Sequence, residues 1–386
     1  MERPAHDVVI IGGGISGTAA AYELSRAGAR VVLCERGELA SMASGWTLAG
    51  VRQSGRHPAE LPLASHAVRR WATLGEELGA DIEYRRGGNL RLALDDDQVA
   101  TISGVVADAR EEGLDLTFLP DNRAVREVAP ALAETIVAAS WCPTDGHANP
   151  TATVLAYAAA AVRLGATILT NTTVDAIVVE GGKTVGVRTD GGFLAADVVI
   201  VVAGIYSDRL LAPLGLALPL TPRHVSVIQT VPMPPLLGPV LGTAKAIFAG
   251  RQQADGRLRF TGGSQPWTPS DTAVFADSVQ PPAGAVARTI ATGMSLLPAL
   301  AEAPVAKVWG GLIDMTPDGL PVIERSAAVD GLVIAAGFCG HGFCLGPTTG
   351  QIICELTTMA SSTLPLEPFR LDRFSGSASA PAELHG

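Results

Sequence analysis

Hydrophobic and polar positions alternate along this chain with two periods, which together predict an α/β protein. Residues 7–11 form a short β-branched run that ends in glycine, an Ala-rich helical pattern follows to about Ala27, and residues 30–35 form a second apolar run. Short apolar runs bounded by glycine are typical of buried strands, whereas a spacing near 3.6 residues indicates a helix. The N-terminal part therefore predicts a strand–helix–strand unit.

The pattern beyond this unit predicts two kinds of structure. Residues 58–78 indicate a helix closed by Gly79, with an apolar face of Leu63, Ala67, Trp71, Leu74 and Leu78. Further elements are expected at residues 90–94 (strand), 150–164 (helix), 166–170 (strand), 181–182 (hairpin turn) and 198–202 (buried parallel strand). Between about residues 221 and 304, proline and glycine interrupt segments of polar alternation, which favours a mainly antiparallel sheet.

The first strand and helix are joined by a Gly-x-Gly-x-x-Gly sequence formed by Gly12, Gly14 and Gly17. In a glycine-rich chain such a match carries little weight alone. Here it follows a strand and opens a helix, and Glu35 ends the next strand about 20 positions later. Gly12 would form the tight turn, Gly14 would let backbone N–H groups approach a pyrophosphate, and Gly17 would let the helix lie close to the strand. With Glu35 accepting from ribose hydroxyls, the pattern predicts a site for NAD or FAD, and an ordinary turn is the alternative.

These elements predict an α/β fold in two parts. A discontinuous Rossmann-like domain, made of a parallel sheet with helices, would bind the dinucleotide, and an antiparallel-sheet domain would bind the substrate. The expected limits are 1–85, 150–215 and 305–374 for the dinucleotide domain, 86–149 and 216–304 for the substrate domain, and 375–386 for a frayed tail.

Composition narrows the function classes. A chain of 386 residues with 47% apolar residues exceeds what one core usually supports, which agrees with two domains. A formal charge of −10 without a basic cluster argues against a nucleic-acid partner, because phosphate binding needs concentrated Lys and Arg. The apolar runs are shorter than the roughly 20 residues that cross a bilayer, so no membrane span is expected.

The cysteines indicate no metal site. They are five in number, scattered and without a C-x-x-C pair, at Cys34, Cys142, Cys339, Cys344 and Cys354. Neither a disulfide framework nor a zinc or iron–sulfur site is therefore expected. Since the N-terminus also lacks the pattern of a secretory signal, we expect a reducing cytoplasm.

Five segments carry a resemblance to a known family. ERGELASMASGWTLAGVRQSGRHP follows the second strand, TNTTVDAI contains Val174, and VVIVVAGIYSDRL spans residues 198–210. Near the C-terminus stand WGGLIDMTPDGLPVIE and LVIAAGFCGHGFCLGPTTGQIICEL. Together they resemble the FAD-dependent D-amino-acid oxidase superfamily, which includes glycine and sarcosine oxidases. The resemblance implies that the dinucleotide is FAD.

The glycine loop and the resemblance together indicate the residues that would bind the cofactor. Small side chains after Glu35 permit a close approach of the backbone to a phosphate and a flat ring. Backbone amides near Gly340 would point at the flavin and stabilise the negative charge of its reduced form. The expected residues are Gly12, Gly14, Ile15, Ser16, Gly17, Glu35, Arg36, Ser44, Gly45, Ala49, Gly50, Val51, Val174, Ala203, Gly204, Gly337, Gly340, His341, Gly342 and Phe343.

The C-terminal glycine loop is expected to lead into a helix that begins at Pro347, because proline suits the first helical position. His341 in this loop either contacts the flavin directly or is bonded to backbone. In the Cys142–Pro150 segment, Asp145 suggests a turn, and Asn149 is expected to cap the helix that starts at Pro150 rather than to act in catalysis.

The substrate-binding residues of the best-known relatives are missing. Glycine oxidase and its relatives commonly place the arginine that binds the substrate carboxylate in a Leu-Arg-Pro-x-Thr segment, whereas this chain has Leu-Ile-Asp-Met-Thr at residues 312–316. The lysine and the flavin-bonding cysteine of monomeric sarcosine oxidases are also absent, with Cys344 and Gly311 at the positions that correspond, so noncovalent FAD is expected. Arg52 and Arg56 are the candidates for carboxylate binding, although arginines in such loops often only pair with surface carboxylates. With His341 they are the candidate catalytic residues.

The resemblance implies hydride transfer from the carbon beside an amine to flavin N5, giving an imine. The segments AGVRQSGRHPAELPLA, CPTDGHANP and Asp-Met-Thr-Pro-Asp-Gly most closely resemble the FAD-bearing catalytic subunit of heteromeric dehydrogenases or oxidases that act on D-hydroxyproline, proline, opines or sarcosine. The expected partners are a small amino-acid or imino-acid substrate and companion subunits that carry FMN, FAD or iron–sulfur centres. A stand-alone amine oxidase that makes hydrogen peroxide, and an FAD-binding electron-relay subunit without its own substrate, are the alternatives. The particular amine, its stereochemistry and the electron acceptor stay open.

Overall fold

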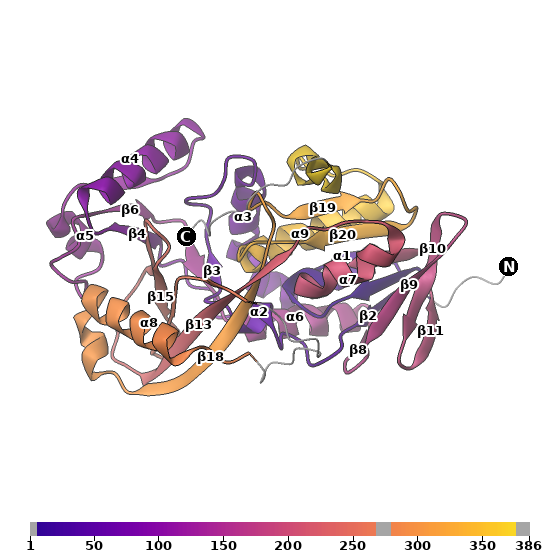
Figure 1. Ribbon diagram of the computed structural model, residues 1–386, viewed down its shortest axis with the longest axis horizontal. Coiled ribbons are helices and arrows are strands. Elements are labelled where there is room, and N and C mark those ends of the chain that lie inside the picture. Colours follow the sequence, from indigo (N-terminus) through magenta and orange to yellow (C-terminus); the bar gives the residue numbers. More distant parts are fainter. Residues whose placement is uncertain (1–5, 268–278, 376–386) are drawn as a thin grey trace.

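A six-stranded sheet forms one half of the molecule in the computed structural model, which describes residues 6–267 and 279–375 (Figure 1). Its strand order is β19-β20-β12-β1-β2-β8, and its strands are β1 (Val8–Ile11), β2 (Val31–Cys34), β8 (Thr167–Leu169), β12 (Val198–Val201), β19 (Val322–Arg325) and β20 (Leu332–Ala336). Neighbouring strands are parallel except β19, which pairs antiparallel with β20. This topology confirms the Rossmann-like half of the predicted fold.

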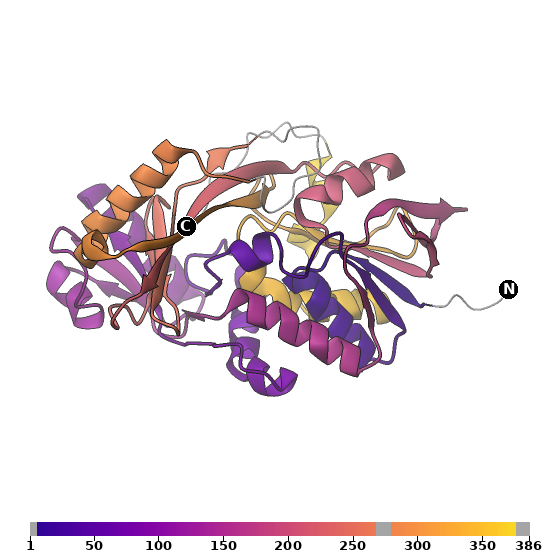
Figure 2. The same ribbon diagram turned by 90° about the horizontal axis from the view of Figure 1, so that it is seen from below.

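Both faces of this sheet are buried, which explains its continuous apolar strands. Val8 and Ile10 of β1 pack into the core under the helices, whereas Val9 and Ile11 point to the opposite face. The helices on the first face are α1 (Ile15–Arg26), α3 (Leu61–Leu78), α6 (Pro150–Arg163) and α9 (Gly342–Thr358). The second face is covered by a three-stranded antiparallel sheet of β9 (Val174–Glu180), β10 (Lys183–Thr189) and β11 (Gly192–Ala195), with α7 (Ser207–Leu211) beside it. Figure 2 shows the helical layer beneath the strands.

Helix α3 follows its sequence pattern closely. All five residues of the predicted apolar face are fully buried. The helix ends at Gly79, whose backbone is left-handed with φ of 64°, as expected for a glycine that closes a helix.

A nine-stranded sheet forms the other half of the molecule. Its order is β17-β13-β16-β15-β14-β4-β6-β5, with β18 paired to β13. The strands are β4 (Asn89–Ala93), β5 (Thr117–Leu119), β6 (Ala138–Cys142), β13 (Thr221–Pro232), β14 (Val240–Thr243), β15 (Phe248–Gln252), β16 (Arg257–Gly262), β17 (Gln265–Pro266) and β18 (Val305–Met315). Within the described part of this sheet, only β14 and β4 pair in parallel. The predicted, mainly antiparallel sheet is therefore confirmed.

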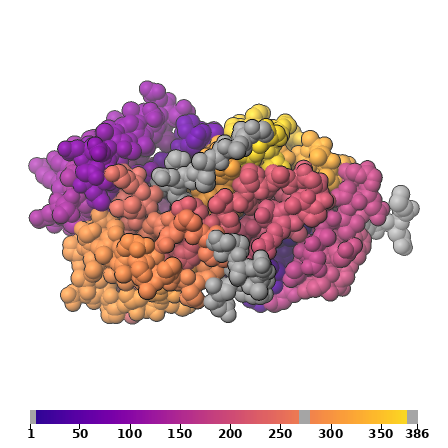
Figure 3. Space-filling model, viewed as in Figure 1, coloured from indigo at the N-terminus to yellow at the C-terminus, as the bar shows by residue number. Residues whose placement is uncertain are grey.

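The other described elements include four helices and a two-stranded ribbon. They are α2 (Ala43–Trp46), α4 (Asp96–Glu111), α5 (Asn122–Val128) and α8 (Ala283–Leu296), with β3 (Gly50–Val51) and β7 (Gly146–His147) forming a two-stranded ribbon. In the space-filling view, the orange segment around α8 and the magenta segment around β9–β11 lie at opposite ends of the molecule (Figure 3). No helix in the described ranges is long and apolar enough to span a membrane.

Two details differ from the sequence expectations. Helix α9 begins at Gly342, five residues before Pro347, so the predicted start was wrong. Contacts from α3 stabilise the helical turn of α9 that precedes Pro347. Trp71 Nε1 donates to the Cys344 carbonyl (2.8 Å), and Arg70 Nη1 donates to the Pro347 carbonyl (2.7 Å). The expected domain limit at residue 305 is not a sheet boundary, because β18 pairs along β13. The division into domains stays a prediction, and most of its expected tail, residues 376–386, lies outside the described residues.

Candidate functional site

A cavity of about 650 Å³ is lined by residues from both large sheets. Its walls include the loop between β1 and α1, the segment after β2, the facing strands β13 and β18, the loop before α9, and β4 with β14. Cavities of this size hold cofactors and small ligands. The segments that the sequence predicts to bind a cofactor therefore line the same cavity.

Two glycines at the junction of β1 and α1 have no room for a side chain. A Cβ atom on Gly12 would lie 2.4 Å from the Val202 carbonyl oxygen, and φ of Gly12 is 122°. A Cβ atom on Gly17 would lie 1.9 Å from the Gly12 oxygen. The start of α1 is therefore pressed against β1 and β12, with its N-terminus at the cavity.

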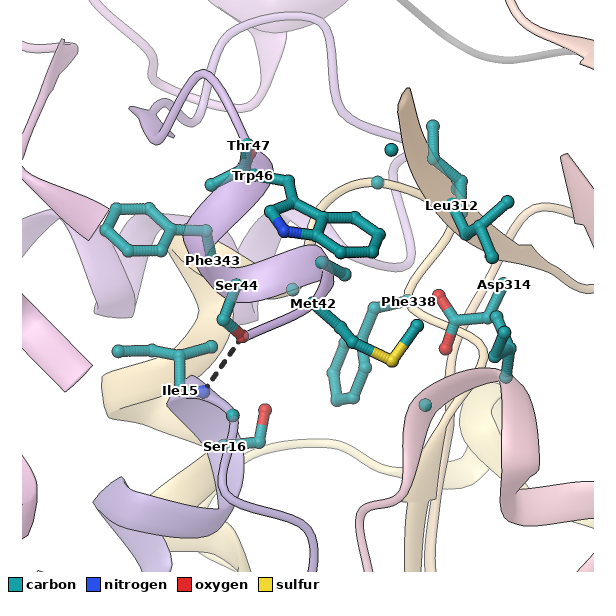
Figure 4. Close-up of a pocket in the computed structure, with 18 of the residues that line it drawn as sticks. Ile15, Ser16, Met42, Ser44, Trp46, Thr47, Leu312, Asp314, Phe338 and Phe343 are labelled. Atoms are coloured by element: carbon teal, nitrogen blue, oxygen red, sulfur yellow. Dashed lines mark hydrogen bonds between the residues drawn. The ribbon is translucent and has the colours of Figure 1, made fainter. Parts of the chain in front are cut away.

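Ser44 shapes the space in front of this helix N-terminus. The backbone N–H of Ile15 donates to Ser44 Oγ at 3.0 Å, as the dashed line in Figure 4 shows. A Cβ atom on Gly14 would lie 2.9 Å from the same oxygen. Ser16 lines the cavity beside them. A helix N-terminus with such donors favours an anion such as a pyrophosphate.

Glu35 is held at one end of the cavity by backbone donors. The N–H of Gly13 donates to its Oε2 (2.7 Å) and the N–H of Gly37 donates to its Oε1 (2.8 Å). Each carboxylate oxygen keeps a further lone pair for a hydroxyl donor. Next to it, the Arg36 guanidinium lies 3.8 Å from the ring centre of Tyr206, which also lines the cavity.

Another part of the cavity is apolar with one buried acid. Met42, Trp46, Leu312 and Phe338 surround it in Figure 4. Asp314, at the end of β18, accepts the backbone N–H of Gly337 at 2.9 Å, and burial raises the pKa of its carboxyl to about 6. This acid belongs to the Leu-Ile-Asp-Met-Thr segment at residues 312–316.

A buried cluster of ionisable groups continues from this apolar part. His341 Nδ1 lies 2.9 Å from Glu60 Oε2, and Arg56 Nη1 lies 3.5 Å from the same oxygen. Arg52 Nη1 donates to the Ser54 carbonyl at 2.7 Å. Arg52, Arg56 and His341 all line the cavity, so the three candidate catalytic residues come together.

The cluster sets unusual protonation states. Burial and the Arg56 charge lower the pKa of His341 to about 4, against the opposing effect of Glu60. Burial opposes ionisation of Glu60, but the His341 ring, which is protonated at low pH, and the Arg56 guanidinium lower its pKa to about 2. Glu60 is therefore a carboxylate and His341 a neutral imidazole at neutral pH.

Residues 142–150 mainly support this cluster. Burial raises the pKa of Asp145, while its carboxylate accepts the backbone N–H groups of Gln53 (2.9 Å) and Ser54 (3.3 Å) and the Ser54 hydroxyl. Asn149 Oδ1 accepts the N–H of Ala152 at 3.1 Å, so it caps α6 as predicted. His147 pairs with Arg251 (2.8 Å) and is not among the lining residues.

Sequence reasoning missed several lining residues, two of which lie on β4. Asn89 and Arg91 lie on the same face of β4, and both line the cavity. The neighbouring Leu90 and Leu92 are fully buried in the core on the other face. The signal was present in the Asn-Leu-Arg-Leu alternation, because a strand with one apolar face presents its polar residues together on the other.

The structure places most of the predicted cofactor residues at the cavity. The lining includes Gly12, Gly14, Ile15, Ser16, Glu35, Arg36, Ser44, Gly50, Val174, Ala203, Gly204, Gly340, His341, Gly342 and Phe343. Gly17, Gly45, Ala49, Val51 and Gly337 are not part of the lining. Several of these act through packing; for example, a Cβ atom on Gly45 would lie 2.0 Å from the Ala40 oxygen.

Comparisons with known proteins agree on one family. Residues 7–356 match the model of the family described as FAD dependent oxidoreductase. The chain is 30% identical over 381 residues to the glycine oxidase of Geobacillus kaustophilus (strain HTA426), covering 96% of this chain and 98% of that protein. It is 27% identical over 379 residues to the sarcosine oxidase subunit beta of Rhizobium meliloti (strain 1021), covering 96% and 89%.

Solved structures give the same result. The crystal structure of glycine oxidase from Geobacillus kaustophilus superimposes with a TM-score of 0.89 at 27% identity, covering 96% of this chain and 99% of that one. The crystal structure of L-proline dehydrogenase from P. horikoshii also has a TM-score of 0.89 at 27% identity, covering 97% and 99%.

The cavity fits FAD, the cofactor of this family. Tight packing at Gly12 and Gly17 holds the N-terminus of α1 close to β1 at the cavity, and a helix N-terminus favours an anion such as a pyrophosphate. Glu35 and Val174 line the end suited to adenosine, and the apolar part around Trp46 and Phe338 suits a flat ring. The cofactor supplies hydride acceptance at its ring, and the chain supplies its binding and the neighbouring charges.

Proposed function

Because this chain belongs to the FAD dependent oxidoreductase family, we propose that it oxidises the C–N bond of a secondary, N-substituted or D-amino acid to an imine, as the catalytic subunit of a heteromeric dehydrogenase. The activity that the relatives support directly is broader: the chain is an FAD-dependent oxidoreductase of amino-acid or N-methyl amino-acid substrates. The carbon beside the nitrogen would give up a hydride, which FAD would accept, while the nitrogen lone pair forms the C=N bond, and loss of the N–H proton would give the neutral imine.

The observation that carries the proposal is the buried arginine cluster beside the apolar part of the cavity. Arg52 and Arg56 line the cavity next to His341, where an amino acid's carboxylate would meet positive charge. An apolar wall that includes Leu312 and Phe338 excludes water around the reacting carbon. Such a site suits a small amino acid held by its carboxylate with its nitrogen toward the ring.

The electron-relay alternative is less well supported. A subunit that only relays electrons needs no cationic pocket next to its cofactor, whereas this chain buries several arginines there. A stand-alone oxidase that produces hydrogen peroxide is the second candidate, because the glycine oxidase relative is matched over 98% of its length.

Anaerobic mixing separates these functions. The purified FAD-loaded chain is mixed without oxygen with D-hydroxyproline, L-proline, D-proline, sarcosine and an opine, and the yellow flavin absorbance is followed. Bleaching by one amine supports catalysis on this chain. Air is then admitted: slow recovery of colour, with fast recovery on adding an artificial acceptor, supports the dehydrogenase. Fast recovery with stoichiometric hydrogen peroxide contradicts the heteromeric dehydrogenase and supports the oxidase.

A further inference from the structure

Arg91 differs from the other arginines of the cavity in its partners. It stands in β4 between two core leucines and points to the opposite, cavity-lining face together with Asn89. Its guanidinium lies close to Gly55, where an added Cβ atom would be 2.6 Å from Nη2. The side chain is therefore held at the cavity by packing rather than by a polar partner.

The neighbouring arginines already make contacts within the protein. Arg52 Nη1 donates to the Ser54 carbonyl, and Arg56 Nε donates to the Arg52 carbonyl at 3.2 Å. Arg56 also faces Glu60. Within residues 6–267 and 279–375, Arg91 makes neither a hydrogen bond nor an ion pair.

The buried cluster carries one more positive charge than negative charges. Three arginines (Arg52, Arg56 and Arg91) face two carboxylates (Glu60 and Asp145). Asp145 receives three donors on its two oxygens, the pattern of an ionised carboxylate. His341 is neutral, and the pKa of Arg91, lowered by burial to about 10, keeps its guanidinium charged at neutral pH. An unpaired charge in such surroundings is strongly stabilised by an anion.

We propose that Arg91 binds the substrate carboxylate, with the Asn89 side chain beside it, and that the site accepts substrates with a single carboxylate. This inference rests on the proposed function and extends it, because it moves the carboxylate anchor from the flavin-side loop to strand β4. A planar guanidinium with all donors available makes a bidentate contact with a carboxylate. One uncompensated positive charge matches one carboxylate, which disfavours dicarboxylic amines.

The test uses unreactive ligands on the FAD-loaded chain. Methoxyacetate has an ether oxygen in place of the amine of an N-methyl amino acid, and methoxyacetamide is its uncharged counterpart. Dissociation constants are read from the perturbation of the flavin spectrum. In Arg91→Met, methoxyacetate is expected to bind roughly 10- to 100-fold more weakly, the usual effect of losing a charged hydrogen-bonding partner, while methoxyacetamide binding stays unchanged. Arg91→Lys should give a smaller loss, again confined to the carboxylate.

A control variant and the contrary outcomes show whether a failure concerns the role of Arg91 or the proposed function. Arg188→Met, on the exposed side of β10, should change neither ligand. If Arg91→Met binds both ligands more weakly by the same factor, or if neither Arg91 variant binds methoxyacetate more weakly, Arg91 is not the carboxylate anchor. The proposed function is unaffected by either result. No spectral response of the wild-type protein to methoxyacetate contradicts the proposed amino-acid site itself. Diglycolate, which carries two carboxylates, should bind no tighter than methoxyacetate, and tighter binding would overturn the preference for one carboxylate.

Discussion

His341 and Glu60 form a buried pair that joins two distant parts of the chain, with His341 Nδ1 at 3.2 Å from Oε1 and 2.9 Å from Oε2 of Glu60. Glu60 precedes α3 and His341 precedes α9, so the pair fixes both helix starts at the cavity. Since Glu60 is ionised and accepts only, the neutral imidazole carries its proton on Nδ1. The pair thus sets the tautomer of the ring that lines the cavity.

The pH dependence of stability should report this pair. The pKa of His341 is about 4 in the folded protein and about 6.5 in an unfolded chain, so the unfolded state binds more protons between these values. The stability that the neutral ring contributes is complete above pH 6.5 and declines as the pH falls toward 4. The free energy of unfolding of the wild type should therefore fall by roughly 2 to 3 kcal/mol more than that of His341→Gln over this range. Parallel urea-unfolding curves for both proteins would contradict this account.

Removal of the Glu60 charge should destabilise the protein strongly. Glu60→Gln leaves Arg56 buried without its carboxylate, and breaking a buried pair in this way costs about 3 to 5 kcal/mol. Urea unfolding of the FAD-loaded protein measures the loss. The matched control is Glu127→Gln, whose exposed pair with Arg123 spans one helix turn and is worth less than about 1 kcal/mol. Similar losses for the two variants would show that the Glu60 pair is not the stabilising contact we infer.

Close packing at the start of α1 predicts a specific loss of cofactor binding. In Gly17→Ala the new methyl group would lie 1.9 Å from the Gly12 oxygen, so the glycine loop must move away from the pyrophosphate site. We expect the purified variant to retain little FAD, as measured by the ratio of flavin to protein absorbance. Gly104→Ala, in α4 with open space around the position, should keep its FAD and gain about 1 kcal/mol of stability. Full FAD retention by Gly17→Ala would refute the assigned site.

The state of the cysteines predicts that FAD is held without a covalent bond. Burial raises the pKa of Cys344, and its Sγ lies 3.3 Å from the Arg52 carbonyl. Burial also raises the pKa of Cys339 to about 12. Protonated thiols are poor nucleophiles, so acid precipitation should release all of the yellow flavin into the supernatant. Flavin that stays with the precipitated protein would contradict this prediction.

The sequence predicted the halves of the fold and much of the cavity because these features are local. The buried runs of β1 and β12, the apolar face of α3 and the Asn149 cap each depend on neighbours in the chain. The start of α9 was missed because contacts from α3, distant in sequence, hold the turn before Pro347.

Arg91 was missed for a related reason. Its strand pattern showed which face it occupies, but only the pairing of β4 with β14 and β6 brings that face to the cavity beside Arg52. Sheet order is a long-range property that no local pattern of this chain contains. The same holds for the Glu60–His341 pair, whose members are separated by most of the sequence.

The central claim is that an amino acid delivers its hydride to the FAD of this chain. The most direct measurement is the anaerobic rate of flavin bleaching when the isolated FAD-loaded chain is mixed with a reducing amine and with the same amine deuterated at the carbon beside nitrogen. The account predicts that the flavin bleaches with no other subunit present and that deuteration slows the bleaching several-fold. A flavin that stays oxidised with every secondary, N-methyl and D-amino acid offered would contradict it.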